Sequence, residues 1–288
     1  MTKVILLSFA SFWLCLITAS AQSDTTYWTK SFQAGLNINQ ASFSDNWKAG
    51  GVNSLAVGLF AKGKASFLKG KTSWDNEMLL EYGMLRTKGT GFRKTADRIL
   101  FDSKYGYKLS KNLNFYASLN FLSQFDNGFR YLKNSANLDS AVVISGLFAP
   151  AFLTQSIGFE YKPVPYFFAR LGIGTLRQTI VSDKELYLTE PKNYGVEQGK
   201  TIRNEMACQL FIGFDKNVAK NINLKASYLL FANYEDLAAM DNRLDVVVAA
   251  KVNKYINTTL TAAMLYDQDQ DFKVQYSQVL ALGILVSL

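Results

Sequence analysis

Acidic side chains recur at alternate positions along one stretch of the chain: Asp75, Glu77 and Glu81. On a β-strand such positions share one face, so the carboxylates are neighbours. Neighbouring carboxylates can act as the acid and base of a glycosidase, or supply oxygen ligands to Ca²⁺. A second stretch carries both signs of charge on one face: Arg98, Asp102 and Lys104. Because opposite charges are supplied on this second stretch, we expect cross-strand ion pairs rather than a catalytic pair.

The same alternation predicts further charged side chains on the inner face of later segments, among them Arg170 and Lys225. The candidate lumen charge ladder therefore comprises eight residues: Asp75, Glu77, Glu81, Arg98, Asp102, Lys104, Arg170 and Lys225. Both signs of charge are mixed in this set, so no strong ion selectivity is expected.

The chain contains no histidine, which removes the Ser–His catalytic pair, histidine metal ligands and histidine pH switching. Of the two cysteines, Cys15 lies in the leader, and Cys208 alone can form neither an intramolecular disulfide nor a thiolate cluster. We therefore expect a non-enzymatic protein without cofactor or metal. A histidine-independent envelope hydrolase is the distant alternative.

The N-terminus has the pattern of a secretory signal peptide, with Lys3, an apolar run over residues 4–17 and Ala19-Ser20-Ala21 as the cleavage site. The apolar run is short for a membrane-spanning helix, and Cys15 follows Leu14 rather than the small residue of a lipoprotein motif. We expect residues 1–21 to be the signal peptide and residues 22–288 to form one domain.

From about Trp28 onward, stretches of ten to fourteen residues alternate apolar with polar or small side chains. The last stretch is the clearest, because most positions on one of its faces are apolar or aromatic: Val274, Tyr276, Leu280, Leu282, Ile284, Val286 and Leu288. The pattern predicts twelve strands, which start near the following residues: Phe32, Asn53, Lys71, Asp97, Leu113, Gln155, Tyr166, Glu205, Ile222, Arg243, Ile256 and Lys273. We predict an all-β, transmembrane, antiparallel up-and-down barrel.

The connectors alternate in length, as expected of a bacterial barrel with short periplasmic turns and longer outer loops. Short links are predicted at residues 68–70, 110–112, 163–165, 216–221 and 254–255, and longer ones between them. A soluble β-sandwich, the alternative for this composition, has no reason to alternate in this way. The longest link, residues 126–154, contains apolar runs that we expect to fold into the barrel mouth or dock on a partner. The polar link over residues 181–204 is expected to be solvated.

Composition agrees with an outer-membrane location in a Gram-negative envelope. Hydrophobic residues make up 49% of the chain, and the net charge of +8 is scattered rather than clustered. Scattered charge disfavours nucleic acid as a partner and suits anionic headgroups and lipopolysaccharide phosphates. The expected partners are therefore the lipid bilayer, lipopolysaccharide, the outer-membrane insertion machinery and possible further envelope proteins. The final residue, Leu288, stands where barrel-assembly signals usually carry an aromatic side chain.

One segment, residues 44–54 with the sequence SDNWKAGGVNS, is more specific than a generic barrel. Together with further short motifs, it resembles a domain-of-unknown-function family of Bacteroidetes-type outer-membrane barrel proteins. These motifs are WDN at 74–76, YG at 82–83, RKTADR at 93–98, KYGY at 104–107 and QF at 124–125. The resemblance extends more loosely to Leu288. It implies an outer-membrane barrel and no established activity.

The resembling residues suggest a second candidate site at the outer end of the first strands. A ligand- or partner-binding corner would comprise six residues: Trp47, Gly50, Gly51, Asn53, Arg93 and Asp97. A purely structural corner, with glycines permitting a sharp turn under the tryptophan, is the alternative. For the whole chain we expect a narrow channel for small solutes. The alternative is a structural or accessory subunit of a larger outer-membrane complex.

Overall fold

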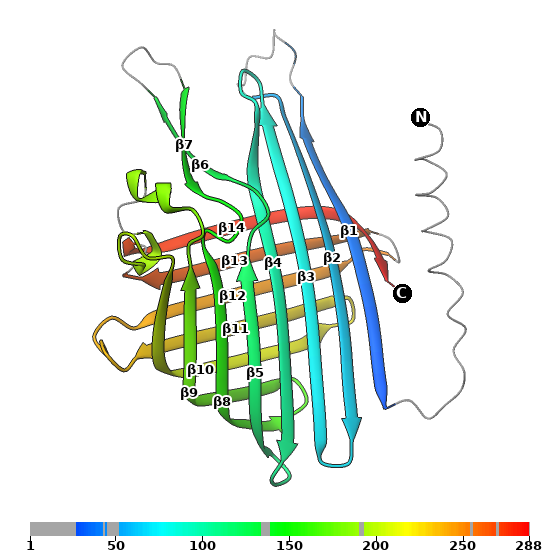
Figure 1. Cartoon of the computed structure of the whole chain (residues 1–288). Coiled ribbons are helices and arrows are strands. Elements are labelled where there is room, and N and C mark those ends of the chain that lie inside the picture. The colour runs from blue at the N-terminus through cyan, green and yellow to red at the C-terminus, as the bar shows by residue number, and fades with distance from the viewer. Residues whose placement is uncertain are drawn as a thin grey trace, which may run out of the picture.

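The computed structural model describes residues 27–42, 44, 52–133, 139–189, 193–253, 256–268 and 271–287. Within them, twelve antiparallel strands close into one barrel, each pairing with its sequence neighbours apart from an insertion between β5 and β8 (Figure 1). The strands are β1 (Trp28–Ala41), β2 (Ser54–Lys69), β3 (Thr72–Thr87), β4 (Phe92–Lys108), β5 (Leu113–Ser123), β8 (Ala151–Val164), β9 (Phe167–Ile180), β10 (Ile202–Ala219), β11 (Ile222–Asn233), β12 (Asp241–Lys251), β13 (Ile256–Asp267) and β14 (Asp271–Ser287). The predicted fold class and the number of barrel strands are confirmed.

The pairing register puts the alternating side chains on two distinct surfaces. Lys62 pairs with Leu79, Lys64 with Glu77, and Asp75 with Lys104, so these groups share the lumen face. The opposite parity supplies the outer wall, where large apolar side chains are exposed, among them Leu59, Met78 and Leu280. Among the described residues, no helix is long and apolar enough to cross a membrane.

Aromatic side chains gather on the lipid-facing surface of the barrel, at the end where the short turns connect the strands. Trp28 lies 5.8 Å from Trp74 between ring centroids, and Phe115 lies 6.0 Å from Phe159. Such rings favour the interface between hydrocarbon and water. Apart from the contact between the first and last strands, every barrel strand is paired along most of its length, so most backbone hydrogen bonds are satisfied within the sheet, as a bilayer requires. The protein is therefore an outer-membrane β-barrel.

Several strands begin earlier than the alternation of apolar residues predicts. β4 starts at Phe92 rather than Asp97, β8 at Ala151 rather than Gln155, and β10 at Ile202 rather than Glu205. In β4 and β10 the backbone pairing continues into largely polar segments, and in β8 it continues into a run of consecutive apolar residues, Ala151–Leu153. Side chains in these segments do not alternate between apolar and polar, so the sequence pattern does not mark them as strand. One predicted long loop is consequently a tight turn over residues 88–91.

The long link between β5 and β8 forms a hairpin of its own, made of β6 (Gly128–Lys133) and β7 (Asp139–Ser145), which extends from the outer end of the barrel in Figure 1. Val143 of this hairpin packs on the loop that follows β9, where a small core consists of Ala149, Val181, Leu186 and Val196. The expectation of a solvated loop over residues 181–204 is thus wrong for its apolar residues. Two short 3-10 turns, η1 (Lys184–Leu188) and η2 (Asn193–Gly195), shape this loop.

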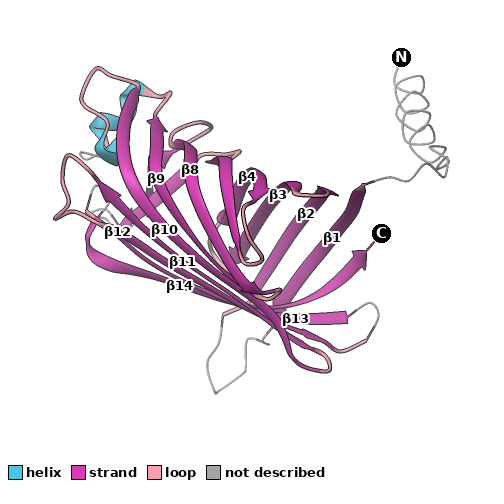
Figure 2. Ribbon diagram, turned by 90° about the horizontal axis from the view of Figure 1, so that it is seen from below, coloured by secondary structure: helices cyan, strands magenta, loops and turns pink. Residues whose placement is uncertain are grey.

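The contact that closes the barrel, between β1 and β14, is short. Over the described residues, their register holds five residue pairs, from Gln33–Ser287 to Asn37–Gly283, whereas β2 and β3 share sixteen. Strands β10–β14 cross behind β1–β5 at a large angle to them, and β14 therefore meets β1 over only part of its length (Figures 1 and 2).

Candidate functional site

Glu160 of β8 is the centre of a buried charge cluster on the lumen face. Its Oε2 lies 2.7 Å from Lys104 Nζ and 2.6 Å from Arg170 Nε. Lys104 Nζ also lies 3.7 Å from Asp75 Oδ2. Asp75–Lys104 and Glu160–Arg170 are directly opposite pairs in the register, and the Lys104–Glu160 contact joins them across β5. Glu160 and Lys104 are 4% and 7% exposed, so their charges depend on one another.

Polar and aromatic groups complete the surroundings of this cluster. Asn120 Nδ2 donates a hydrogen bond of 3.3 Å to Asp102 Oδ1. The Arg170 guanidinium lies 4.3 Å from the ring centroid of Phe168, within cation–π range. Asp102 and Arg170, both predicted for the ladder, therefore line the same side of the lumen as Glu160.

A second group of charges reaches across the lumen. Glu77 Oε1 lies 2.8 Å from Lys62 Nζ and Glu77 Oε2 lies 3.1 Å from Lys64 Nζ. Lys225 projects from β11, which is nearly opposite β2 and β3 in the ring of strands, and it interacts electrostatically with all three. We call Lys62, Lys64, Glu77 and Lys225 the crossing cluster. Charges from opposite walls of the barrel therefore act on one another at this level of the lumen.

The carboxylates predicted for the ladder are engaged by basic groups. Both oxygens of Glu77 face lysines, and Glu81 Oε2 lies 3.8 Å from Arg98 Nη1. A general acid–base pair needs carboxyl groups that are free to exchange protons with a substrate. Over the part of the chain that the structure describes, no three Asp, Glu or Cys side chains gather as metal ligands. The geometry therefore favours the ion-pair interpretation of these residues.

Glu160 was expected to face inward but was not singled out from the sequence. Its importance depends on the pairing of β5 with β8, which lie on either side of a long insertion. Alternation assigns a residue to a face, but it does not show which charges on that face become neighbours.

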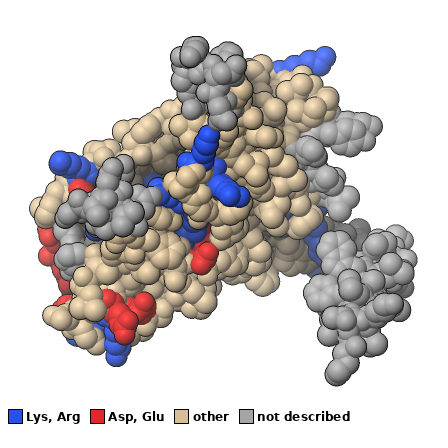
Figure 3. Space-filling view, turned by 90° about the horizontal axis from the view of Figure 1, so that it is seen from above, with Lys and Arg blue, Asp and Glu red and all other residues tan. Residues whose placement is uncertain are grey.

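A third charge cluster at the outer mouth was also missed. Arg177 donates from Nε and Nη2 to Glu205 at 3.0 and 3.1 Å, and from Nη1 to Asp241 Oδ2 at 2.6 Å. Its guanidinium lies 3.7 Å from the ring centroid of Phe231, and Arg203 Nη2 lies 3.1 Å from Glu205 Oε1. We call Arg177, Arg203, Glu205 and Asp241 the outer clasp. Figure 3 shows the outer end, where basic side chains gather towards the middle and acidic ones at one edge.

The predicted corner is only partly described. Trp47, Gly50 and Gly51 lie outside the described residues. The Asn53 carbonyl accepts a hydrogen bond of 2.8 Å from the Lys88 backbone N–H, and the Arg93 guanidinium lies 3.9 Å from the Tyr131 ring centroid. Arg93 therefore contacts the β6–β7 hairpin, and Asn53 contacts the turn between β3 and β4.

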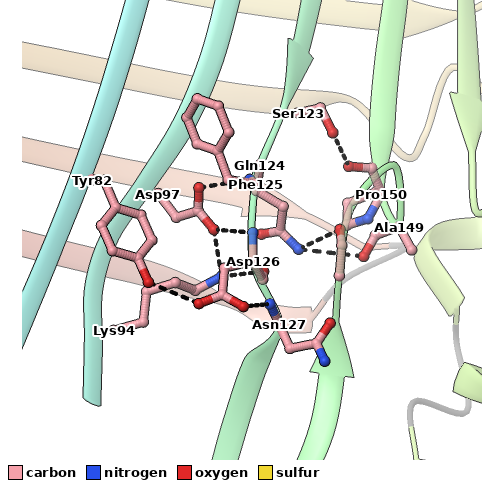
Figure 4. Close-up of polar contacts among 11 residues, drawn as sticks. Tyr82, Lys94, Asp97, Ser123, Gln124, Phe125, Asp126, Asn127, Ala149 and Pro150 are labelled. Carbon is pink, nitrogen blue, oxygen red and sulfur yellow. Dashed lines mark hydrogen bonds and ion pairs between the residues drawn. The ribbon is translucent and has the colours of Figure 1, made fainter. Parts of the chain in front are cut away.

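Asp97 fastens the start of the β6–β7 hairpin to the barrel rim (Figure 4). Its carboxylate accepts hydrogen bonds from the backbone N–H groups of Phe125 and Asp126, at 2.7 and 2.9 Å. Lys94 Nζ donates to Asp97 at 2.7 Å and to the Asp126 carbonyl at 2.6 Å. We call these residues, with Tyr82, the rim knot. The Asp97 side chain is only 3% exposed, so its bonds are shielded from water.

Asp126 and Gln124 extend the rim knot to both ends of the insertion. The Tyr82 hydroxyl donates a hydrogen bond of 2.7 Å to Asp126 Oδ2. This bond, the Asn127 backbone N–H and the Lys94 charge hold the pKa of the Asp126 carboxyl below its usual value. Gln124 Nε2 donates to the Gly146 carbonyl at 2.9 Å, so the residues before β6 and after β7 are joined.

Replacing Asp97 with alanine should release the hairpin while leaving the barrel folded. The change removes two backbone hydrogen bonds and one ion pair from a buried site. We expect trypsin cleavage after Arg130 to accelerate by about tenfold or more. The matched control is Asp183→Ala, because Asp183 accepts the Glu185 N–H in the loop after β9. Equal cleavage rates in the two variants would contradict this role for Asp97.

Residues 38–129 match a family described as a protein of unknown function (DUF3078). The match runs from β1 to the start of β6 and includes Asn53, Arg93 and the whole rim knot. The predicted resemblance to a family without established activity is confirmed over this part of the chain. No curated protein matches the sequence.

Several solved outer-membrane barrels are similar to the chain in structure. The translocator domain of an autotransporter from Neisseria meningitidis is 10% identical, with a TM-score of 0.36, and the match covers 99% of this chain and 96% of that one. An outer-membrane channel from Pseudomonas putida F1 is 10% identical, with a TM-score of 0.39 and coverages of 93% and 97%. The NanC porin is 8% identical, with a TM-score of 0.38 and coverages of 89% and 97%. At these values the likeness does not indicate a function.

Proposed function

We propose that this outer-membrane barrel is a non-enzymatic, narrow channel for small solutes. The crossing cluster is the observation that supports it. Lys62, Lys64 and Glu77 lie on one wall of the lumen and Lys225 on the other, and their charges act on one another across it. Charged rings of this kind control conduction in channels.

The crossing cluster faces water rather than a dry interior. The side chains of Lys64 and Glu77 are 44% and 24% exposed, in contrast to the 5% of Glu160. Lysine and glutamate that are hydrated inside a barrel line a path that small polar solutes share with water. The excess of lysine in this cluster also gives anions a modest advantage at this level, although both signs of charge line the lumen as a whole.

Planar-bilayer recordings test the channel. The purified protein should give steady single-channel steps, and Lys225→Glu should raise the ratio of cation to anion permeability by about threefold or more. Lys216→Glu is the matched control. Lys216 Nζ lies 4.4 Å from the Tyr166 ring centroid, at the short-turn end of β10 and on the face that points away from the lumen. A protein that inserts and folds but gives no steps is not a channel.

A second candidate is an accessory subunit of a larger envelope complex, and the β6–β7 hairpin supports it. The hairpin is fastened by the rim knot and carries the exposed apolar residues Phe129, Tyr131 and Leu132. Isolation in gentle detergent distinguishes the two functions. Stoichiometric co-purification of envelope proteins that is lost on removal of residues 128–145 would favour the subunit.

A further inference from the structure

The seam between β1 and β14 leaves part of the barrel wall unpaired. Beyond the Asn37–Gly283 pair, residues 38–41 of β1 pair with β2 alone. In the described part of the chain, residues 271–282 of β14 have registered partners only in β13. Five pairs at about 3.3 Å per residue span roughly 16 Å, less than the roughly 25 Å apolar band of such barrels. Pairing at the seam therefore does not cover the full thickness of the hydrocarbon.

Side chains on both faces of β14 are accessible beside this seam. Val279 belongs to the lumen face by its register with Thr261, yet it is 54% exposed. Leu280, on the lipid face, is 65% exposed. Across the seam, Ile38 of β1 is 51% exposed. Val279 is thus accessible from the lumen and Leu280 from the bilayer, on a stretch of β14 whose only registered partner is β13.

The edge of the opening is apolar on its lumen side. The lumen-facing residues of β14 next to the seam are Ser277, Val279, Ala281 and Gly283, and none carries a charge. The charge clusters instead occupy β2–β4 and β8–β12. An apolar solute would have to desolvate those charges on an axial path, which is costly. Along β14 it meets no such barrier.

Where the pairing ends, amide side chains lie over a glycine. Gly283 is flanked by Asn37 of β1 and Asn257 of β13, and a side chain at this position would overlap Asn37. Asn257 Oδ1 is buried without a hydrogen-bond partner. An acceptor left in this state is costly, so the pairing of β1 with β14 ends at an energetically unfavourable contact.

We propose that the β1–β14 seam is a lateral opening through which small apolar or amphipathic solutes pass between the lumen and the bilayer. Exposed apolar groups on both faces of β14 and an uncharged lumen edge fit a solute with an apolar body. The inference extends the proposed channel function by naming a solute class and an exit, and its tests are separable from conductance.

Access from the bilayer to Val279 tests the opening directly. In the mature protein with Cys208→Ser, a bimane fluorophore on Val279→Cys should be quenched by nitroxide-labelled phosphatidylcholine. We expect quenching about threefold stronger than at Val247→Cys, which has the same face and the same original residue but paired neighbours on both sides. Met264→Cys, on the lipid face of β13, gives the upper limit. Equal quenching at positions 279 and 247 would overturn the proposal.

A disulfide across the opening tests whether solutes pass through it. Continuing the register by two residues pairs Asn39 with Ala281, so Asn39→Cys/Ala281→Cys should clamp the seam under oxidation. Cells carrying the protein should take up a radiolabelled aromatic hydrocarbon at least several-fold more slowly when clamped, and reduction should restore uptake. Val247→Cys/Thr261→Cys is the control clamp, because it joins a pair inside the closed wall.

The possible outcomes separate the two proposals. Normal conductance with unchanged hydrocarbon uptake in the clamped protein would overturn the lateral opening and leave the channel intact. Missing conductance with clamp-sensitive uptake would overturn the axial channel alone. Cross-linking of single-cysteine Val279→Cys or Leu280→Cys proteins into dimers would show that a second copy covers this edge, and would overturn the opening.

Discussion

Replacing Glu160 with glutamine should destabilise the barrel more than any other single change in the lumen. The variant leaves Lys104 and Arg170 without the carboxylate that lies within 2.7 Å of both. Breaking a buried ion pair by removing one partner typically costs about 3–5 kcal/mol, because the remaining charge stays desolvated. We therefore expect the free energy of unfolding in lipid vesicles, measured by guanidinium titration, to fall by about that amount.

Two companion variants distinguish this explanation from a general sensitivity of the lumen. Glu77→Gln removes a carboxylate that is less buried than Glu160 and whose lysine partners, Lys62 and Lys64, are 21% and 44% exposed, so the expected loss is smaller, about 1 kcal/mol. Adding Lys104→Met to Glu160→Gln removes one uncompensated charge and should restore part of the stability. Equal losses for Glu160→Gln and Glu77→Gln would contradict the role of burial.

Arg177→Met should have the second-largest effect, through the outer clasp. Arg177 makes a two-point contact with Glu205 and a further bond to Asp241, and Glu205 is 3% exposed. Its loss leaves Asp241 without this partner and Glu205 with Arg203. We expect the free energy of unfolding to fall by about 2–4 kcal/mol. Arg177→Lys should recover less than half, because an ammonium cannot reproduce the planar fork.

Arg243→Met is the matched control for this prediction. Arg243 contacts Asp245, two residues along the same strand, at 2.7 Å, and its side chain is 29% exposed. The same substitution there should cost about 1 kcal/mol or less. A loss at Arg243 equal to that at Arg177 would show that the geometry of the outer clasp has no special importance.

The strands and their faces could be predicted because each rests on local information. Side chains alternate along every strand, so Asp75, Glu77 and Lys104 could be placed on the inner face from their positions alone. Strand ends were less accurate. Polar extensions such as residues 92–96 of β4 pair through the backbone, and backbone pairing leaves no pattern in side-chain type.

The organisation of the charges required pairing information that a single sequence does not contain. Glu160 and Lys104 are 56 residues apart, and they meet because β8 follows β5 in the sheet after an intervening hairpin. Arg177 and Asp241 are separated by 64 residues and belong to strands that are not adjacent. The Asp97 bonds to Phe125 and Asp126 also depend on backbone geometry in a turn. Conversely, the apolar runs of the long insertion correctly indicated that it must pack somewhere.

The five-pair seam also affects how the barrel assembles. The contact between the first and last strands closes the sheet, and in the described residues it adds five residue pairs to a sheet whose β2–β3 contact alone has sixteen. The almost complete sheet is therefore nearly as well paired as the closed barrel. The free-energy landscape around the native state is shallow along one coordinate, the separation of β1 and β14. Slow breathing motions of this protein in the membrane should concentrate there, while the wall around Glu160 stays rigid.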